Sequence, residues 1–353
     1  MIDKSIFNKD YINQKRIELK CDPTILERTI FAFGLLEAMV KSGAEFIFKG
    51  GSCLLLMLDR PLRLSTDIDI IAKPGTDILK FVLEVSKTYP FVRYEESVRK
   101  GVNNIEKKHF RFFYKSLTDE SKEIPILLDV LFEENHYSKL WQKEIKNEIV
   151  LTKGEPIYVN IPSPESLLGD KLTAFAPKTI GVRPITEKSD GKIIDKKVEV
   201  IKQFFDVASL YDFIDNFNDV IISYNKTAES ELKYRGLKIS IKDCLMDTFE
   251  AAASIMCRGK IDSESYKDYL EGIKGLGNFL VNTRFNAETA YIPAAKVMYL
   301  SACIIKDIHP IDEIPEQDLL KDKYSKLNYL RKLDKKYFNM AAYAVKLLEN
   351  NDS

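Results

Sequence analysis

Histidine and cysteine are scarce in this sequence of 353 residues, and neither is clustered. The three histidines are dispersed along the chain: His109, His136 and His309. The five cysteines also lack any paired spacing: Cys21, Cys53, Cys244, Cys257 and Cys303. A zinc site needs several such ligands at short intervals, so this pattern argues against one. Scattered cysteines, odd in number, suit a reducing compartment, and we therefore expect free thiols and a cytoplasmic location.

Long apolar runs and an excess of charge of either sign are also missing. No run approaches the roughly 20 apolar residues that a membrane-spanning helix requires, and residues 1–20 are too polar and charged for a signal peptide. Lysine plus arginine number 53, as do aspartate plus glutamate, so the net charge is zero and no global field attracts nucleic acid. We expect a protein without a membrane segment, in which any site for a polyanion is a local patch.

The chain does contain enough apolar material for a sizeable core, since 45% of its residues are hydrophobic and 11% are aromatic. Its length suggests about two domains. Strand-like segments are common up to residue 161, whereas almost everything beyond it has helical spacing. The sequence therefore predicts an α+β protein with an α/β domain over residues 1–161 and a helical domain over residues 162–353.

The most informative stretch is Phe-Ile-Phe-Lys-Gly-Gly-Ser at residues 46–52. Its apolar residues predict a short strand, and Gly50, Gly51 and Ser52 predict a sharp turn into a following helix. Glycine lets backbone N–H groups approach a ligand without an intervening Cβ, and the start of a helix carries partial positive charge. The turn is therefore a candidate phosphate-binding site.

Two aspartates follow on the next predicted strand. Asp67 and Asp69 stand two apart, so both side chains leave the same face of that strand. Two like charges held side by side repel each other. The usual compensation is a hard cation such as Mg²⁺, which takes carboxylate oxygens and substrate phosphates together.

A third aspartate interrupts the apolar segment of residues 124–132. Asp129 stands there in what we expect to be a central strand, buried on both faces. A buried carboxylate is costly unless it is protonated, hydrogen-bonded or bound to a metal. We favour the metal, with Asp129 completing the site of Asp67 and Asp69, because a partner in so apolar a strand is hard to find. A buried aspartate hydrogen-bonded to a turn is the alternative.

Charged residues also mark the helical half. Lys171 lies within the apolar stripe of a helix that begins at Ser163. Its ammonium either reaches the surface or turns to something anionic, and we favour the anion. Lys202 and Asp206 stand four apart and by spacing alone predict a solvent-exposed ion pair. Residues 179–196, rich in Gly, Pro, Ser, Lys and Asp, predict a loop and a candidate lid.

Together these segments carry a resemblance. The Gly-Gly-Ser turn followed by Arg-Leu-Ser-Thr-Asp-Ile-Asp at residues 63–69 resembles the nucleotidyltransferase superfamily, the fold type of DNA polymerase β. The fuller string is similar to the AbiEii/AbiGii-type toxins of bacterial type IV toxin–antitoxin and phage-defence systems. Residues 171–174 (Lys-Leu-Thr-Ala) and 202–206 (Lys-Gln-Phe-Phe-Asp) resemble two further motifs of these toxins, with Gln203 where the family usually has an acid. The resemblance covers residues 30–215.

The resemblance implies a Mg²⁺-dependent nucleotidyltransferase with a mixed sheet, which takes an NTP as substrate and releases pyrophosphate. The residues implied for nucleotide binding are Gly50, Gly51, Ser52, Arg63, Ser65 and Lys171. The residues implied for the metal are Asp67, Asp69 and Asp129. The residues implied for catalysis are these three aspartates together with Lys171 and Asp206. Asp206 is implied to act as a base or to organise the active site, which is expected between the two domains. The implied acceptor is RNA, with a tRNA 3′ end expected, and the implied partner is a separately encoded antitoxin.

Other functions stay open at the level of sequence. The same enzyme class could act on a small molecule such as an aminoglycoside, or on a protein hydroxyl. A non-catalytic nucleotide-binding protein is a third hypothesis, against which the presence of all three aspartates and Lys171 counts. The basic and aromatic residues of 321–336 fit either RNA contact or a solvated helix face, and we favour the face.

Overall fold

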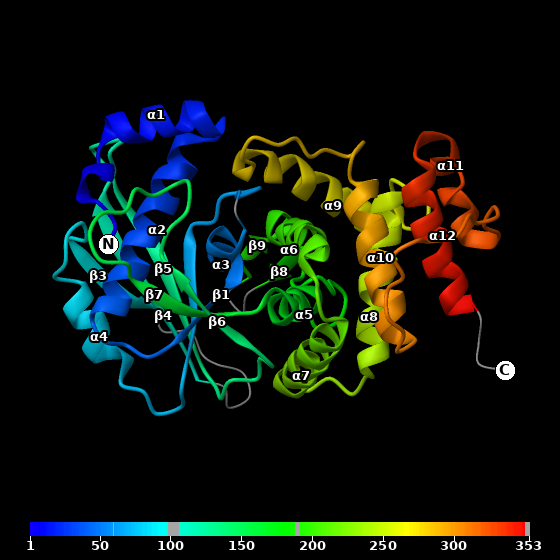
Figure 1. The fold of residues 1–353 in the computed structure, drawn as a ribbon, viewed down its shortest axis with the longest axis horizontal. Helices are drawn as coiled ribbons and strands as arrows, with labels where there is room; N and C mark the ends of the chain where they lie inside the picture. Colours follow the sequence, from blue (N-terminus) through cyan, green and yellow to red (C-terminus); the bar gives the residue numbers. More distant parts are fainter. Residues whose placement is uncertain (59, 98–105, 188–190, 350–353) are drawn as a thin grey trace. The chain divides into compact units, whose positions relative to one another are not determined.

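The computed structural model describes residues 1–58, 60–97, 106–187 and 191–349 (Figure 1). It confirms the expected α+β class, with a mixed seven-stranded sheet and a helical C-terminal region. None of the described helices is both long enough and apolar enough to cross a membrane.

The chain divides into two compact units. Unit 1 comprises Met1–Ser163 and the later segment Asn278–Thr283, and unit 2 comprises Pro164–Gly277 and Arg284–Ser353. The segment Asn278–Thr283 therefore belongs to unit 1 although helices of unit 2 precede and follow it in the sequence.

Unit 1 holds the seven-stranded sheet, with strand order β3-β4-β5-β2-β1-β7-β6. Its elements in chain order are η1 (Lys4–Ile6), α1 (Lys9–Leu19), α2 (Pro23–Lys41), β1 (Ile47–Lys49), α3 (Gly50–Met57), β2 (Asp67–Ala72), α4 (Ile78–Val85), β3 (Arg93–Ser97), β4 (Lys107–Lys115), β5 (Glu123–Phe132), β6 (Leu140–Glu144) and β7 (Tyr158–Pro162). The pairs β2/β5 and β1/β7 are parallel, whereas the other neighbouring strands are antiparallel.

Helix α2 packs against β2 and β5 and buries one face of the sheet. The buried residues of these two strands include Ile68, Ile70, Leu128 and Val130. Burying an aliphatic side chain of this size contributes about 1.5–3 kcal/mol to stability. Because side chains alternate along a strand, Asp67, Asp69 and Asp129 all lie on the opposite face.

The prediction that β5 is buried on both faces is wrong. Its residues alternate between buried and partly exposed, and 37% of the Asp129 side chain is accessible. The strand is central in the sheet, as predicted, but α2 covers only one of its faces. Continuous apolar sequence was the misleading signal, because Leu127 and Leu131 lie on the partly exposed face beside Asp129.

A buried carboxylate on α2 holds the turn between β4 and β5. Glu27 has no exposed surface. It accepts hydrogen bonds from the backbone N–H groups of Leu117 (2.7 Å) and Thr118 (3.2 Å), and from the hydroxyls of Ser116 (3.3 Å) and Thr118 (2.5 Å). These donors satisfy the charge, so the turn is anchored to the helix that covers the sheet.

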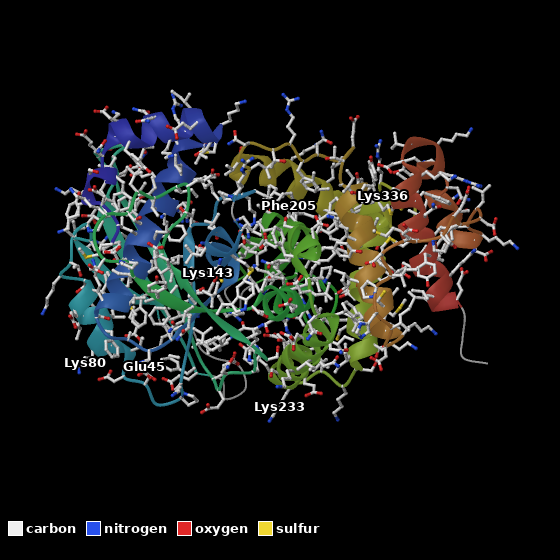
Figure 2. The ribbon with its side chains drawn as sticks, viewed as in Figure 1. Glu45, Lys80, Lys143, Phe205, Lys233 and Lys336 are labelled. Atoms are coloured by element: carbon white, nitrogen blue, oxygen red, sulfur yellow. The ribbon has the colours of Figure 1, made fainter. Side chains whose placement is uncertain are left out.

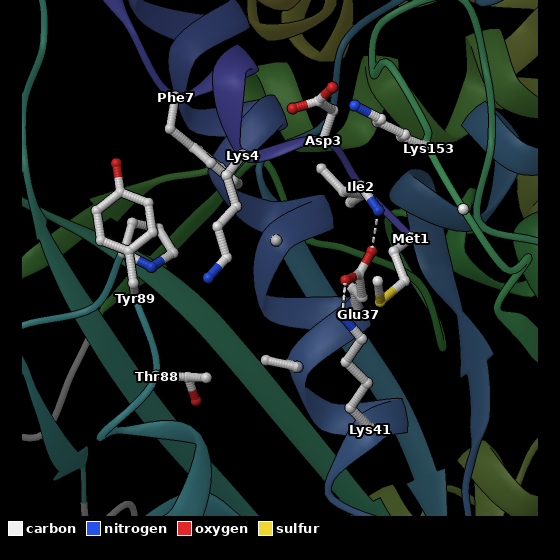
Figure 3. A pocket seen from close by; sticks show the side chains of 14 residues that line it. Met1, Ile2, Asp3, Lys4, Phe7, Glu37, Lys41, Thr88, Tyr89 and Lys153 are labelled. Atoms are coloured by element: carbon white, nitrogen blue, oxygen red, sulfur yellow. Dashed lines mark hydrogen bonds and ion pairs between the residues drawn. The ribbon is translucent and has the colours of Figure 1, made fainter.

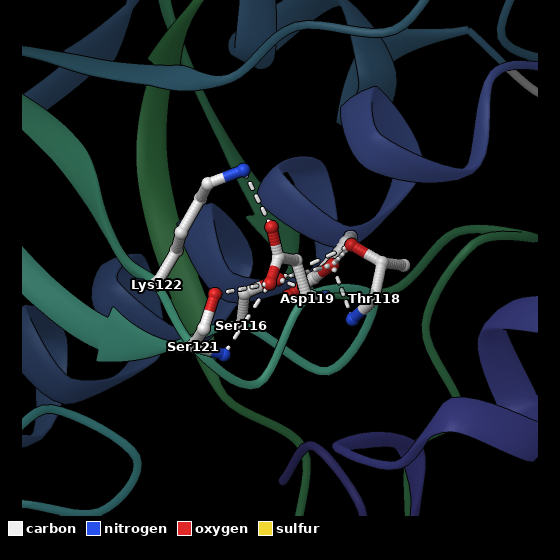
Figure 4. Close-up of polar contacts among 6 residues, drawn as sticks. Ser116, Thr118, Asp119, Ser121 and Lys122 are labelled. Atoms are coloured by element: carbon white, nitrogen blue, oxygen red, sulfur yellow. Dashed lines mark hydrogen bonds and ion pairs between the residues drawn. The ribbon is translucent and has the colours of Figure 1, made fainter.

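The same turn carries a second, exposed set of contacts, which Figure 4 shows around Asp119. Asp119 accepts from the hydroxyl of Ser121 at 2.6 Å and pairs with the ammonium of Lys122 at 2.5 Å. These hydrogen bonds lower the pKa of Asp119 to about 2. The carboxylate is therefore ionised across the physiological range.

Replacing Glu27 by alanine is expected to lower the free energy of unfolding of unit 1 by about 2–4 kcal/mol, because buried donors lose their acceptor. Chemical denaturation followed by circular dichroism measures this change. Glu120→Ala is the control, since Glu120 is exposed in the same turn, and it should change stability by less than about 0.5 kcal/mol. Equal effects of the two substitutions would contradict the assigned role of Glu27.

Unit 2 is predominantly helical, with one short hairpin. Its elements are α5 (Pro164–Ala174), β8 (Ile185–Glu187), β9 (Ile193–Asp195), α6 (Lys197–Leu210), η2 (Tyr211–Phe213), α7 (Phe217–Arg235), α8 (Ile241–Met256), α9 (Ser263–Leu276), η3 (Gly277–Phe279, whose last two residues belong to unit 1), α10 (Tyr291–Ile305), η4 (Asp322–Leu327), α11 (Leu330–Leu333) and α12 (Lys335–Glu349). Helix α10 is largely buried and packs against α6, α8 and α12.

The predicted loop of residues 179–196 contains the hairpin β8/β9. Its antiparallel register pairs Ile185 with Asp195 and Thr186 with Ile194. Cross-strand contact between β-branched residues stabilises such a pair, although the polar composition of the segment suggested a loop. Residues 188–190 of the predicted loop lie outside the described residues.

The basic and aromatic segment 321–336 is largely paired within unit 2. Lys323 and Tyr324 both contact the carboxylate of Glu250, at 2.6 and 2.7 Å. Lys336, labelled in Figure 2, lies 5.5 Å from the ring centroid of its neighbour Tyr337. These contacts tie Lys323 and Tyr324 to α8, and the choice between RNA contact and a solvated helix face stays a prediction.

Candidate active site

Strand β1 leads directly into α3, and Gly50, the first glycine of the predicted turn, is the first residue of that helix and lies against β2. Gly50 has a φ of +80°, a conformation that favours glycine. A Cβ built on Gly50 would lie 2.1 Å from Oδ2 of Asp69. The preceding residue, Lys49, is the register partner of Asp69. The phosphate-binding turn and the aspartate strand predicted from the sequence are therefore in direct contact.

Gly51 is close to two polar side chains of the loop before β2. A Cβ on Gly51 would lie 2.6 Å from Nη2 of Arg63 and 2.8 Å from Oγ of Ser65. Arg63 is buried, and its Nη1 donates to the carbonyl of Leu64 at 2.9 Å. The structure thus brings Arg63 and Ser65, both predicted to bind nucleotide, to the glycine turn.

Ser52 has a structural contact that the sequence did not reveal. Its side chain is buried, and its hydroxyl donates to the backbone carbonyl of Asp67 at 2.6 Å. This hydrogen bond ties the first turn of α3 to the start of β2. The predicted role of Ser52 in phosphate binding stays a prediction.

The loop that carries Arg63 is held by the late segment Asn278–Thr283. The backbone N–H of Leu64 donates to the carbonyl of Phe279 at 2.7 Å, and that of Val281 donates to Leu62 at 3.0 Å. These contacts join residues more than two hundred positions apart. No periodicity or motif in the sequence of Asn278–Thr283 predicts these contacts.

The three aspartates lie on the open face of the sheet. Asp67 and Asp69 are partly exposed, and Asp69 stands opposite Asp129 in the parallel register of β2 and β5. The hydroxyl of Thr66 donates to Oδ1 of Asp67 at 3.2 Å. The expected neighbourhood of these strands is therefore present, with Asp69 and Asp129 directly side by side.

Asp129 has a partner that sequence reasoning did not find. Nδ1 of His109, on β4, lies 2.6 Å from Oδ1 of Asp129. The two residues are register partners across the antiparallel pair β4/β5. The expectation that a partner for Asp129 is hard to find was wrong, because the partner belongs to another strand, twenty residues earlier.

The residue types at the site suit a hard divalent cation, because carboxylate oxygens are the ligands that Mg²⁺ prefers. Within the described parts of the chain, however, no group of three or more His, Cys, Asp and Glu side chains is arranged to hold a metal ion. Mg²⁺ commonly takes one or two protein carboxylates and completes its shell with substrate phosphates. Asp67 and Asp69 fit that arrangement, and Asp129 as a third ligand stays a prediction.

In unit 2, two of the predicted residues form a buried ion pair. Nζ of Lys171, on α5, lies 2.9 Å from Oδ2 of Asp206, on α6, and donates to Oε1 of Gln203 at 3.0 Å. The side chains of Lys171 and Asp206 are only 6% and 1% exposed. Lys171 thus turns to an anion, as predicted, and the anion in this structure is Asp206.

The spacing-based expectation of a solvent-exposed pair between Lys202 and Asp206 is wrong. Asp206 is buried against Lys171, and Lys202 pairs with Glu199 at 2.9 Å. Four-residue spacing indicates only that two side chains share a helix face. Packing of α6 against α5 decides that this face is buried. That Lys171 and Asp206 act together with Asp67 and Asp69 stays a prediction.

A separate cavity of about 610 Å³ lies in unit 1 between the N-terminal segment, α2 and the loop before β3. Figure 3 shows Glu37 at its wall, where the carboxylate accepts from the backbone N–H of Ile2 and pairs with Lys41. None of the predicted site residues lines this cavity.

Comparison with known protein families gives a match that includes these residues. None of the curated proteins compared with this chain matches it. The model of a family described as "Nucleotidyl transferase AbiEii toxin, Type IV TA system" matches residues 35–276, which is more than half of the chain. The match spans the glycine turn, the three aspartates and the Lys171–Asp206 pair. The resemblance seen in the sequence is thereby confirmed, and the chain belongs to the AbiEii nucleotidyl transferase toxin family of type IV toxin–antitoxin systems.

Proposed function

We propose that this nucleotidyltransferase toxin is Mg²⁺-dependent and transfers a nucleoside monophosphate from an NTP to RNA, with a tRNA 3′ end as the acceptor. Its activity would arrest growth in a phage-defence system, and a separately encoded antitoxin would oppose it. Family membership supports the enzyme class, the toxin role and the antitoxin. The acceptor, the metal and the role in phage defence are the parts that this proposal adds.

The observation that carries the proposal is the contact of the glycine turn with the carboxylate strand. A turn that opens a helix offers backbone N–H groups to phosphate oxygens. Gly50 lies directly against Asp69, so a triphosphate on the turn would have its charge beside the carboxylates. A shared Mg²⁺ would neutralise that charge and polarise the α-phosphate for attack.

Different residues of this chain would bind the phosphates, hold the cation and assist the chemical step. The amides of Gly50 and Gly51 would cradle the phosphates, and Arg63, against Gly51, would contribute positive charge. Asp67 and Asp69 would hold the cation. Lys171 would stabilise the negative charge that develops on the departing pyrophosphate, and Asp129 or Asp206 would receive the proton of the attacking hydroxyl.

A labelling assay tests the proposal. The purified protein and Mg²⁺ are incubated with each α-³²P-labelled NTP and total bacterial tRNA, with Asp67→Ala in parallel. We expect label to enter tRNA with the wild type only, and with one or a few of the NTPs. Label that enters a small molecule or a protein instead of tRNA would show that RNA is not the acceptor. Activity that persists in EDTA would refute the dependence on Mg²⁺.

The substitution Gly50→Ala should abolish transfer, because its Cβ would collide with the Asp69 carboxylate. Gly43→Ala is a matched control: Gly43 has the same φ of +80°, but no atom beyond its two chain neighbours lies within 4 Å of its Cβ position. Both variants pay a backbone cost of about 1 kcal/mol. Thermal unfolding should therefore shift in both variants, and further in Gly50→Ala because the Asp69 side chain must also move, while activity is lost only in Gly50→Ala. Full activity of Gly50→Ala would contradict the proposed site.

A further inference from the structure

A row of polar side chains crosses the open face of the sheet in unit 1. The register aligns Lys49 on β1 with Asp69 on β2, Asp69 with Asp129 on β5, and Asp129 with His109 on β4. Register partners on neighbouring strands point to the same face. The row therefore places two carboxylates side by side, with a cationic side chain at one end and an imidazole at the other.

The contact at the imidazole end is short and directional. His109 Nδ1 and Asp129 Oδ1 are 2.6 Å apart, and 15% of the His109 side chain is accessible compared with 37% of Asp129. Because β5 lies between β2 and β4, this hydrogen bond draws Oδ1 of Asp129 towards β4 and away from Asp69. The second oxygen, Oδ2, is then held in one orientation.

The carboxylate of Asp129 needs such a restraint. Like charges on adjacent strands repel each other, and a partly exposed aspartate without a partner can turn its oxygens to solvent. A hydrogen bond from an imidazole N–H to a carboxylate fixes both groups, as the partners of metal-bound and catalytic side chains do elsewhere. His109 is thus suited to orient Asp129 for the reaction.

We propose that His109 is a positioning residue for nucleotidyl transfer and acts through Asp129. The inference rests on the proposed function, in which Asp129 takes part in the reaction. His109 itself needs no contact with substrate. Its removal should therefore slow the chemical step and leave nucleotide binding largely unchanged.

The first test is a double-mutant cycle in the labelling assay with the purified full chain. His109→Phe should lower kcat by about 10–100-fold, the usual cost of removing a supporting hydrogen bond, and should change the KM for NTP by less than about twofold. His109→Asn, whose amide can donate near the position of Nδ1, should recover much of the loss. The variant His109→Phe/Asp129→Ala should be no slower than Asp129→Ala alone.

The matched control is His136→Asn. His136 is also a histidine of unit 1 beside a carboxylate, with Nδ1 3.3 Å from Oε1 of Glu133, but it lies outside the row. Its substitution should leave kcat unchanged. Losses that add in the His109/Asp129 double variant, or wild-type rates in His109→Phe, would overturn the inference while leaving the proposed function intact. If the wild type labels no acceptor, the proposed function fails and the inference fails with it.

A second measurement is independent of turnover. Because the chain has only three histidines, imidazole ¹⁵N and ¹H signals can be assigned by single substitutions. Nδ1 of His109 should carry a proton shifted downfield by its carboxylate partner, and Asp129→Ala should remove that shift without altering the signals of His136 and His309. A His109 signal that does not respond to Asp129→Ala would overturn the inference.

Discussion

Replacing Asp67 by asparagine is expected to lower kcat/KM for nucleotidyl transfer by at least about 10³-fold, because several kcal/mol of charge stabilisation in the transition state depend on the carboxylate. The fold should be unaffected. Asp67 is partly exposed, the asparagine oxygen can still accept from Thr66, and one of two neighbouring negative charges is removed. The free energy of unfolding should therefore change by less than about 0.5 kcal/mol.

The measurement combines the labelling assay with chemical denaturation. Asp10→Asn is the control, since Asp10 is an exposed aspartate of α1 in the same unit; it should leave activity unchanged and lower stability by less than about 1 kcal/mol, the usual contribution of a carboxylate in the first turn of a helix. Binding of a non-hydrolysable NTP should weaken in Asp67→Asn when Mg²⁺ is present and should be similar to wild type when it is absent. If Asp67→Asn transferred nucleotide at the wild-type rate, the assignment of the carboxylate pair would be wrong.

Removing the ammonium of Lys171 should have the largest effect on stability. Lys171→Met leaves the carboxylate of Asp206, 1% exposed, without the partner at 2.9 Å. Breaking a buried pair by removing one partner typically costs about 3–5 kcal/mol. Lys323→Met is the control in unit 2, because the pair of Lys323 with Glu250 is far more exposed and should contribute less than about 1 kcal/mol.

A double substitution separates the structural role of this pair from the catalytic one. In Lys171→Met/Asp206→Leu both buried charges are gone, and apolar replacement of a whole buried pair is often neutral or stabilising. We expect the melting temperature to recover towards that of the wild type while nucleotidyl transfer stays abolished. A double variant that is both stable and active would show that the pair only stabilises the helical unit.

Much of the fold could be predicted from short stretches of the sequence. Glycines at positions 50 and 51 predict a turn because of their backbone freedom, and Asp67 and Asp69 share a face because side chains alternate along a strand. Helical spacing separates the later part of the chain from the sheet-forming part. Each of these inferences depends on residues within a few positions of one another, which is the range over which propensity and periodicity act.

Pairing between distant segments was beyond that range. The apolar sequence of β5 suggested burial on both faces, yet α2 covers only one of them. His109 meets Asp129 through the register of β4 and β5, and Lys171 meets Asp206 through the packing of α5 on α6. Leu64 donates a hydrogen bond to Phe279, more than two hundred positions later in the sequence.

The sequence by itself determined the family, the glycine turn, the aspartate pair and the division into sheet and helices, because motif and periodicity are local properties. Only the tertiary structure decided which partner each buried or half-buried charge has, since that depends on strand register and helix packing. The Asp129–His109 and Lys171–Asp206 contacts are both of this second kind. For Asp129 and for Lys171 the partner comes from another element of the fold, because a charge that packing buries must find its partner among the elements packed against it.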